Sequence, residues 1–168
     1  MTSPRTIRDP QADHMLTPEN AALVIIDFQP IQVSSIASMP KRTLVANITA
    51  VARTAKLYGL PTVFSTVNVA TGRNAPMIHQ LADLFPDAKP IDRTSINAWE
   101  DDDFVAAIRA TGRKKLIMAA LWTEVCLVFP GIDAIHAGYE VYPVVDAVGG
   151  TSLEAHKAGL QRLIQAGG

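Results

Sequence analysis

The feature that most constrains the fold of this 168-residue chain is the alternation of short apolar runs with helical segments. The first run, Ala21–Ile26, is entirely apolar and rich in β-branched residues, which is typical of a strand buried on both faces of a sheet. Strands separated by helices predict the α/β class, here a three-layer α/β/α domain with a mainly parallel, doubly wound, Rossmann-like sheet. Further strands are predicted at residues 62–67, 89–93, 115–121 and 140–146, helices at 41–58, 77–84, 101–110, 124–137 and 153–166, and loops at 28–38 and 69–76.

Three chemically capable residues are expected to meet at one edge of this sheet. The common strand order is 3-2-1-4-5, and ligands then bind beyond the carboxyl ends of the strands, between the first and the fourth. Asp27 follows the first predicted strand, Arg93 ends the third, and Cys126 follows the fourth. The sequence therefore predicts a carboxylate, a guanidinium and a thiol in one crevice.

Cys126 is the only cysteine, and it lies where a helix is predicted to begin. Backbone N–H groups and the helix dipole favour a thiolate at such a place, although a lone cysteine in an apolar stretch is more often a small core residue. Asp27 would accept the thiol proton, and Arg93, which stays protonated, would hold Asp27 bidentately. A plain Asp27–Arg93 salt bridge is the structural alternative, and Glu124 is expected to point away because a second acid would oppose thiol activation.

Other residues beside this crevice are candidates for the oxyanion site and the substrate pocket. Two of the backbone N–H groups of Trp122, Thr123 and Cys126 could bind an oxyanion. Thr123 has the alternative role of a helix N-cap, and packing in the core or on the surface is an equally good reading for Asn97 and Trp99. Pro130 would mark a special first turn or a kink in the following helix. The pocket candidates are Phe28, Gln29, Asn97, Trp99 and Thr123.

Composition limits the partners of the chain. A net charge of −1 and a pI near 6.4 argue against nucleic acid or an anionic membrane surface, and no apolar run approaches the roughly 20 residues of a membrane span. One cysteine excludes an internal disulfide and favours the reducing cytoplasm.

We expect a single domain over residues 1–168 with a polar N-terminal extension at 1–18 that lacks the core of a signal peptide. The histidines have no ligand-like spacing and no phosphate-binding glycine loop occurs, so neither a metal nor a cofactor is predicted.

Three stretches together resemble the isochorismatase-like cysteine hydrolase superfamily from about residue 21 to the C-terminus. Val24–Gln29 resembles its first strand with a catalytic aspartate, Arg93–Trp99 the stretch that begins with a catalytic lysine, and Leu121–Cys126 the turn that carries the nucleophile. Arginine replaces the usual lysine at position 93. Together with Ile96–Trp99 and Thr123–Cys126, this is similar to the YcaC-type branch. The superfamily also implies a sixth strand after the last helix, for which this sequence has no segment.

The resemblance implies a catalytic triad of Asp27, Arg93 and Cys126, with a cis peptide bond between Leu121 and Trp122. The N–H groups of Trp122 and Cys126 would form the oxyanion hole. The implied reaction is metal-independent cleavage of a C–N, amide-like bond in a small molecule through a thioester, by a homo-oligomer. Two other functions stay open from the residues alone, namely a thiol redox sensor and a non-catalytic assembly scaffold.

Overall fold

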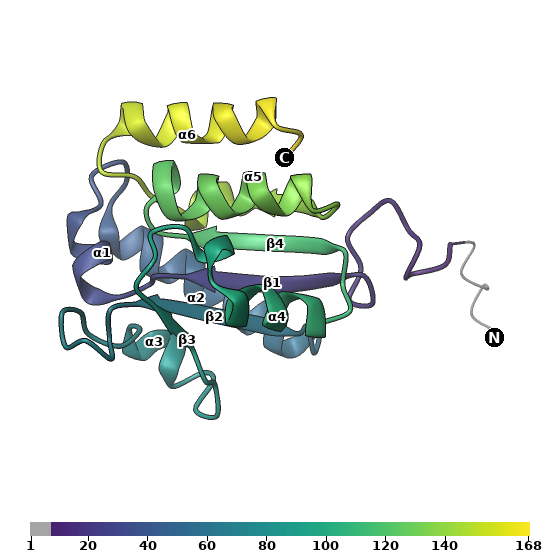
Figure 1. The fold of residues 1–168 in the computed structure, drawn as a ribbon, viewed down its shortest axis with the longest axis horizontal. Coiled ribbons are helices and arrows are strands. Elements are labelled where there is room, and N and C mark those ends of the chain that lie inside the picture. Colours follow the sequence, from purple (N-terminus) through teal and green to yellow (C-terminus); the bar gives the residue numbers. More distant parts are fainter. Residues whose placement is uncertain (1–7) are drawn as a thin grey trace.

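A five-stranded parallel sheet forms the centre of the computed structural model, which describes residues 8–168 (Figure 1). The strand order β3-β2-β1-β4-β5 is the one that the sequence predicts. The strands are β1 (Ala21–Ile26), β2 (Thr62–Val67), β3 (Ile91–Arg93), β4 (Lys115–Ala120) and β5 (Glu140–Pro143).

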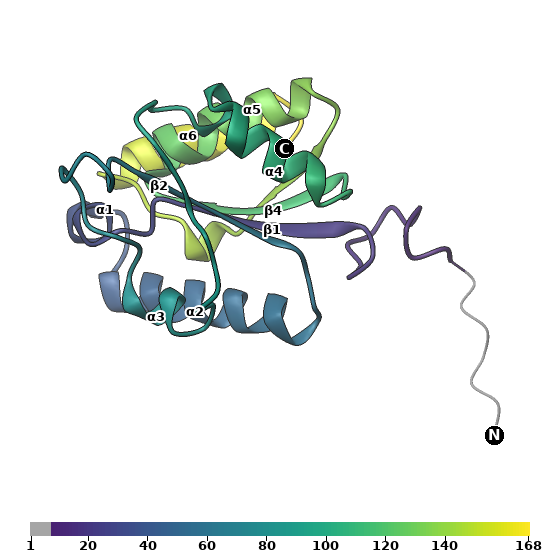
Figure 2. The ribbon, with the colours of Figure 1, turned by 60° about the horizontal axis from the view of Figure 1, so that its bottom comes forward.

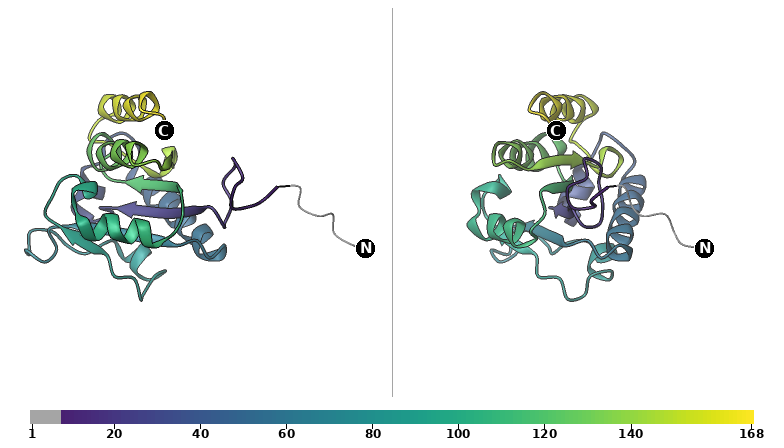
Figure 3. Two further views of the ribbon diagram at one scale, coloured as in Figure 1. Left: turned by 45° about the vertical axis from the view of Figure 1, so that its right-hand side comes forward. Right: turned by 90° about the vertical axis from the view of Figure 1, so that its right-hand side faces the viewer.

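Helices cover both faces of the sheet, which confirms the three-layer α/β/α architecture. In Figure 2 the helices α2 and α3 lie below the sheet, and α4, α5 and α6 lie above it. The view along the strands in Figure 3 shows α2 and α4 on opposite sides. The helices are α1 (Pro30–Ser35), α2 (Lys41–Leu57), α3 (His79–Ala82), α4 (Asp102–Ala110), α5 (Val128–His136) and α6 (Leu153–Gln165).

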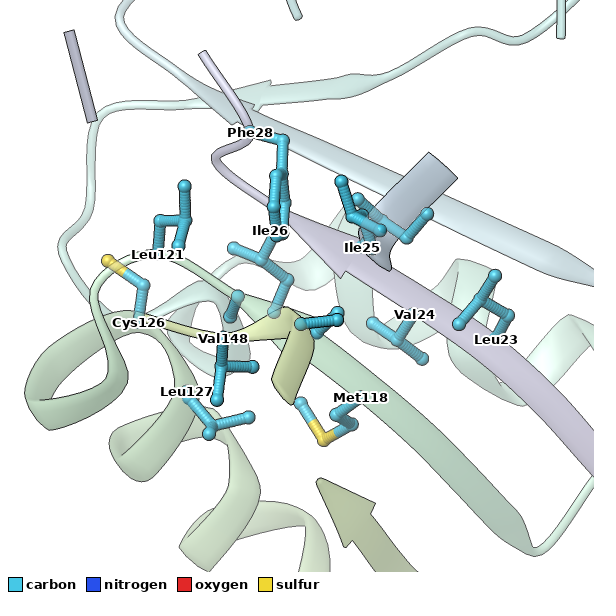
Figure 4. Close-up of a cluster of buried hydrophobic side chains, with 14 of the residues drawn as sticks. Leu23, Val24, Ile25, Ile26, Phe28, Met118, Leu121, Cys126, Leu127 and Val148 are labelled. Carbon is cyan, nitrogen blue, oxygen red and sulfur yellow. The ribbon is translucent and has the colours of Figure 1, made fainter. Parts of the chain in front are cut away.

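The central strand β1 brings the carboxyl ends of its two neighbours to the same level. All six of its residues are buried, as expected for a strand covered by helices on both sides. Its last residue, Ile26, is paired with Ser65 of β2 and with Ala120 of β4. Figure 4 shows Phe28, Leu121 and Cys126 at this end of the buried cluster that continues through Val24 and Met118. Residues that follow β1 and β4 are therefore neighbours in space.

Several predicted boundaries were wrong. The predicted loop at 28–38 contains the short helix α1, in which Pro30 occupies the first turn, where its missing N–H costs nothing. The fifth strand ends at Pro143 instead of 146, because proline cannot donate to the sheet ladder, and a 3₁₀ turn follows at Val145–Ala147. The third strand begins only at Ile91.

The segment before β1 lies across the amino-terminal edge of the sheet and extends away from it (Figure 3). The Nζ atom of the buried Lys115 donates to the carbonyls of His14 at 2.7 Å and Met15 at 3.3 Å. Residues 1–7 of the predicted N-terminal extension lie outside the described part of the chain. Between residues 8 and 168, no helix is both long and apolar enough to cross a bilayer.

The packing of α4 generates a stability prediction. Phe104 is fully buried, with its ring edge-on to that of Trp99 at 6.2 Å between centroids, whereas Leu57 at the end of α2 is 82% exposed. Phe104→Ala should lower the free energy of unfolding by about 3–5 kcal/mol, through lost burial and the cavity left behind. Leu57→Ala should change it by less than about 0.5 kcal/mol. Urea denaturation followed by circular dichroism measures both values, and similar losses in the two variants would contradict this packing.

Candidate active site

Asp27 is positioned by a sharp change of direction directly after β1. Its φ of +59° lies in the left-handed region, which aspartate tolerates better than most residues. Its N–H still donates to the Ser65 carbonyl as part of the sheet, at 3.0 Å. Its own carbonyl accepts from the Gln29 N–H at 2.7 Å. The chain thus leaves the sheet at Asp27, whose carboxylate stays fully buried at the sheet edge.

Arg93 binds this carboxylate with the bidentate geometry that the sequence predicts. The two terminal guanidinium nitrogens donate to the two Asp27 oxygens, each at 2.7 Å, and both side chains are at most 1% exposed. The same nitrogens donate to Ser65 Oγ at 3.1 Å, the Thr66 carbonyl at 3.0 Å and the Ile96 carbonyl at 3.1 Å. Burial alone lowers the pKa of Arg93, but the hydrogen bonds and charge of Asp27 outweigh this and leave that pKa raised. Arg93 is therefore a permanent cation at this site.

Cys126 lies beside this ion pair. Its sulfur is 4.0 Å from the Ile96 carbonyl, which also accepts from Arg93, and the residue is 7% exposed. In Figure 4 the sulfur is directed away from Leu127 and Met118, toward the side on which Leu121 lies. The sequence therefore predicts correctly that the three groups meet at one edge of the sheet.

The expectation of a thiolate at Cys126 was wrong. Burial raises the pKa of the Cys126 thiol to about 12, and the charge and hydrogen bonding of Asp27 act in the same direction. Arg93 and the Trp122 N–H lower this pKa but do not compensate. The thiol is thus protonated at neutral pH and lies beside a carboxylate that can take its proton.

The turn that carries Cys126 is π-helical and spans Thr123–Leu127; we call it the Cys126 turn. The Leu127 N–H donates to the Trp122 carbonyl at 3.2 Å, five residues back, as in a π-helix. Pro130 has no N–H to donate to the Cys126 carbonyl, so of the two readings open for this proline the special first turn is correct. The peptide bond between Leu121 and Trp122 is cis, as the family resemblance implies.

The side chain of Glu124 points away from the sulfur, as predicted. Its Oε1 accepts from the N–H of Thr151 at 2.9 Å and from the hydroxyl of Thr151 at 2.7 Å. Glu124 therefore joins the Cys126 turn to the segment before α6 and does not oppose the chemistry of the thiol.

Two pocket candidates next to Asp27 have internal partners. Phe28 is 1% exposed and belongs to the core. The Gln29 amide is fully buried. It accepts from Val67 N–H at 2.9 Å and donates to the carbonyls of Val67 at 3.2 Å and Ala75 at 2.6 Å. Gln29 thus holds the loop after β2 at both ends, and a role in contacting substrate stays a prediction.

The pocket candidates after β3 also have internal partners. Asn97 accepts from Trp99 N–H at 3.0 Å and donates to Asp133 of α5 at 2.7 Å. The Trp99 ring packs edge-on against Tyr139, with 5.6 Å between centroids. Thr123 is fully buried, and its hydroxyl contacts His156 instead of capping the turn. Their contribution to a substrate pocket stays a prediction.

Sequence reasoning missed the polar residues that hold Arg93 and the Cys126 turn. Ser65 and Thr66 interrupt an otherwise mostly apolar strand, and this signal could have identified Ser65 as a partner of Arg93. His156 carried no such signal, because it lies 33 residues from Thr123 in sequence. Among residues 8–168, no three His, Cys, Asp or Glu side chains lie close enough together to hold a metal ion. Metal-independent chemistry stays a prediction.

The comparisons with known proteins agree with this geometry. The isochorismatase domain profile matches residues 21–168, so the chain belongs to the isochorismatase family of hydrolases. Within that family it is of the YcaC type. It is 38% identical over 153 residues to "Probable hydrolase YcaC" of Escherichia coli K12, a match that covers 90% of this chain and 73% of that protein.

Two solved structures of the YcaC type superimpose on most of the chain. The crystal structure of Escherichia coli YcaC, described as an octameric hydrolase of unknown specificity, has a TM-score of 0.87 at 37% identity. YcaC from Pseudomonas aeruginosa, described with hexane-2,5-diol and covalent acrylamide, has a TM-score of 0.87 at 35% identity. Both matches cover 92% of this chain and 76% of the other.

The opposing effects of Asp27 and Arg93 on the pKa of the Cys126 thiol generate a prediction about its alkylation. In the wild-type protein the rate of reaction with iodoacetamide should rise about tenfold per pH unit from pH 7 to 10 without a plateau, because the thiol pKa is about 12. Asp27→Asn removes the charge that raises this pKa and leaves Arg93, which lowers it. The variant should therefore react at least about tenfold faster at pH 8.

Intact-mass spectrometry of the protein measures these rates, and thermal unfolding verifies that the variant is folded. Asp146→Asn, at an exposed aspartate, is the matched control and should react like the wild type. Slower alkylation in a folded Asp27→Asn protein would contradict the assigned role of Asp27 in holding the thiol neutral.

Proposed function

We propose that this chain is a metal-independent cysteine hydrolase that cleaves the C–N bond of a small amide-like molecule through a thioester. The observation that carries the proposal is the position of a neutral, buried thiol beside a carboxylate that Arg93 holds by two 2.7 Å hydrogen bonds. A nucleophile and a proton acceptor within reach of each other, with a third group fixing the acceptor, form the arrangement that covalent catalysis requires.

In the first half of the reaction, the Cys126 sulfur attacks the amide carbon while its proton passes to Asp27. The N–H groups of Trp122 and Cys126 would bind the oxyanion that forms. The C–N bond then breaks, Asp27 returns the proton to the leaving amine, and a thioester remains on Cys126. Because the thiol stays protonated until substrate arrives, proton transfer and attack are coupled.

In the second half, a water molecule replaces the amine. Asp27 takes a proton from this water as its oxygen attacks the thioester carbon. The C–S bond breaks, the carboxylic acid leaves, and Asp27 gives the proton back to the sulfur. Arg93 stays protonated throughout, so its part is to orient Asp27 and to balance its charge.

The adduct described for the Pseudomonas aeruginosa relative supports a reactive nucleophile in proteins of this type. Acrylamide is an electrophile that adds to nucleophiles such as thiolates, and it is described there as covalent. In this chain Cys126 is the only thiol. We propose that it is the nucleophile here.

The two other functions have less support. Peroxide oxidises the thiolate form of cysteine, and a pKa of about 12 leaves Cys126 protonated, which disfavours a redox sensor. A non-catalytic scaffold would not require the only cysteine to lie beside the buried ion pair of Asp27 and Arg93, so this placement favours catalysis over a scaffold. A catalytic thiol must also stay reduced, which agrees with the expected cytoplasmic location.

The proposed nucleophile can be tested with a panel of small amides and ureas. Cys126→Ala should lower turnover of any substrate found by at least about a thousandfold, because no thioester can form. Mass spectrometry of the quenched wild-type reaction should show an acyl adduct on Cys126 that the variant lacks. Turnover at the wild-type rate in Cys126→Ala would refute the proposal.

We also propose that the chain forms a homo-oligomer, as described for Escherichia coli YcaC. Light scattering coupled to size-exclusion chromatography should give a mass of at least twice the 18.1 kDa of one chain at micromolar concentration. A monomer under these conditions would be evidence against self-association.

A further inference from the structure

Helix α6 packs against the Cys126 turn. The hydroxyl of Thr123, between Trp122 and Cys126 in sequence, lies 2.8 Å from Nδ1 of His156. Burial lowers the pKa of His156, although the charge of Glu124 acts in the opposite direction. The imidazole is therefore neutral at pH 7. Its Nδ1 can accept a hydrogen bond from the Thr123 hydroxyl when Nε2 carries the ring proton.

The conformation of the Cys126 turn makes it dependent on such outside contacts. Its hydrogen bonds run from Leu127 to Trp122 and from Val128 to Thr123, in the widened π-helical pattern that is rare and occurs mostly as single turns. The Thr123 N–H does not donate within the turn but to the Gly149 carbonyl, at 2.9 Å. The segment from Gly149 to α6 therefore supplies the acceptor for an N–H at the start of the turn, where a helix has no internal acceptor of its own.

The backbone of α6 approaches the Cys126 turn very closely at Gly159. A Cβ atom at this position would lie 3.0 Å from Glu124 Cα and 3.3 Å from the Thr123 carbonyl carbon. Both of these are main-chain atoms, which cannot rotate away as a side chain does. The close approach brings His156, one turn earlier on α6, against Thr123.

We propose that His156 is a positioning residue for the reaction, which acts through the Thr123 hydroxyl to fix the Cys126 turn. With the turn fixed, the Trp122 N–H stays directed at the Cys126 sulfur, where it lowers the pKa of the thiol. This inference rests on the proposed function, because the geometry that His156 preserves is that of the proposed nucleophile.

The test compares variants that remove the hydrogen bond with variants that keep it. Thr123→Val and His156→Leu remove it with little change in size, whereas Thr123→Ser keeps the hydroxyl and His156→Asn places an amide near the position of Nδ1. The readout is the rate at which acrylamide forms an adduct on Cys126, followed by intact mass, with thermal unfolding measured on every variant. His136→Leu, at an exposed histidine of α5, is the matched control.

Thr123→Val and His156→Leu should each slow adduct formation about tenfold, because a turn that is no longer fixed loses the Trp122 N–H that lowers the pKa of the Cys126 thiol. The double variant should be no slower than either single variant, because both remove the same interaction. Thr123→Ser and His156→Asn keep a hydrogen bond between the two side chains, and His136→Leu leaves it untouched. All three variants should therefore react within about threefold of the wild-type rate.

Unchanged rates in Thr123→Val and His156→Leu would overturn the positioning role and leave the proposed function intact. Equal slowing in the conservative variants, together with lower thermal stability, would likewise overturn it in favour of a purely structural contact. A wild-type protein that forms no adduct at Cys126 would count against the proposed function itself. If His156→Leu does not fold, the comparison of Thr123→Val with Thr123→Ser decides the question.

Discussion

The buried ion pair between Asp27 and Arg93 is the interaction on which the rest of the site depends. It joins the ends of two strands that are not adjacent, β1 and β3, and the strand between them contributes Ser65 and Thr66 as further partners of the guanidinium. Removing one member of such a pair leaves an uncompensated buried charge, which costs about 3–5 kcal/mol. The pair also restricts the chemistry. Arginine holds its proton, so all proton transfer in the proposed reaction passes through Asp27.

The protonation state of Cys126 is a balance between groups that only the fold brings together. The local sequence places a thiol at the start of a helix, a position that ordinarily favours the thiolate. In the folded chain, burial and the carboxylate of Asp27 outweigh Arg93 and the Trp122 N–H, so the thiol stays neutral. In the proposed reaction the thiolate therefore forms only when substrate is bound, by transfer of the thiol proton to Asp27.

The parts of this structure that could be predicted are those with a local periodic signal or a rule that ties strand ends together. Helix α2 has its predicted limits to within a residue, because buried Leu44 and Ile48 repeat at helical spacing and Gly59, at a φ of +63°, ends the pattern. The convergence of Asp27, Arg93 and Cys126 followed from the strand order. The helix α1 and the partner of Thr123 could not be predicted. A six-residue helix spans too few turns for a period, and His156 is joined to Thr123 only by tertiary packing.

The buried amide of Gln29 has a consequence for how related chains can diverge. It holds the loop after β2 by hydrogen bonds to main-chain atoms only, those of Val67 and Ala75. Main-chain groups are the same whatever residues occupy the loop. The side chains between these two positions can therefore be substituted without breaking the hydrogen bonds to Gln29. The side chains of this loop can thus change during evolution without disturbing the proposed triad of Asp27, Arg93 and Cys126.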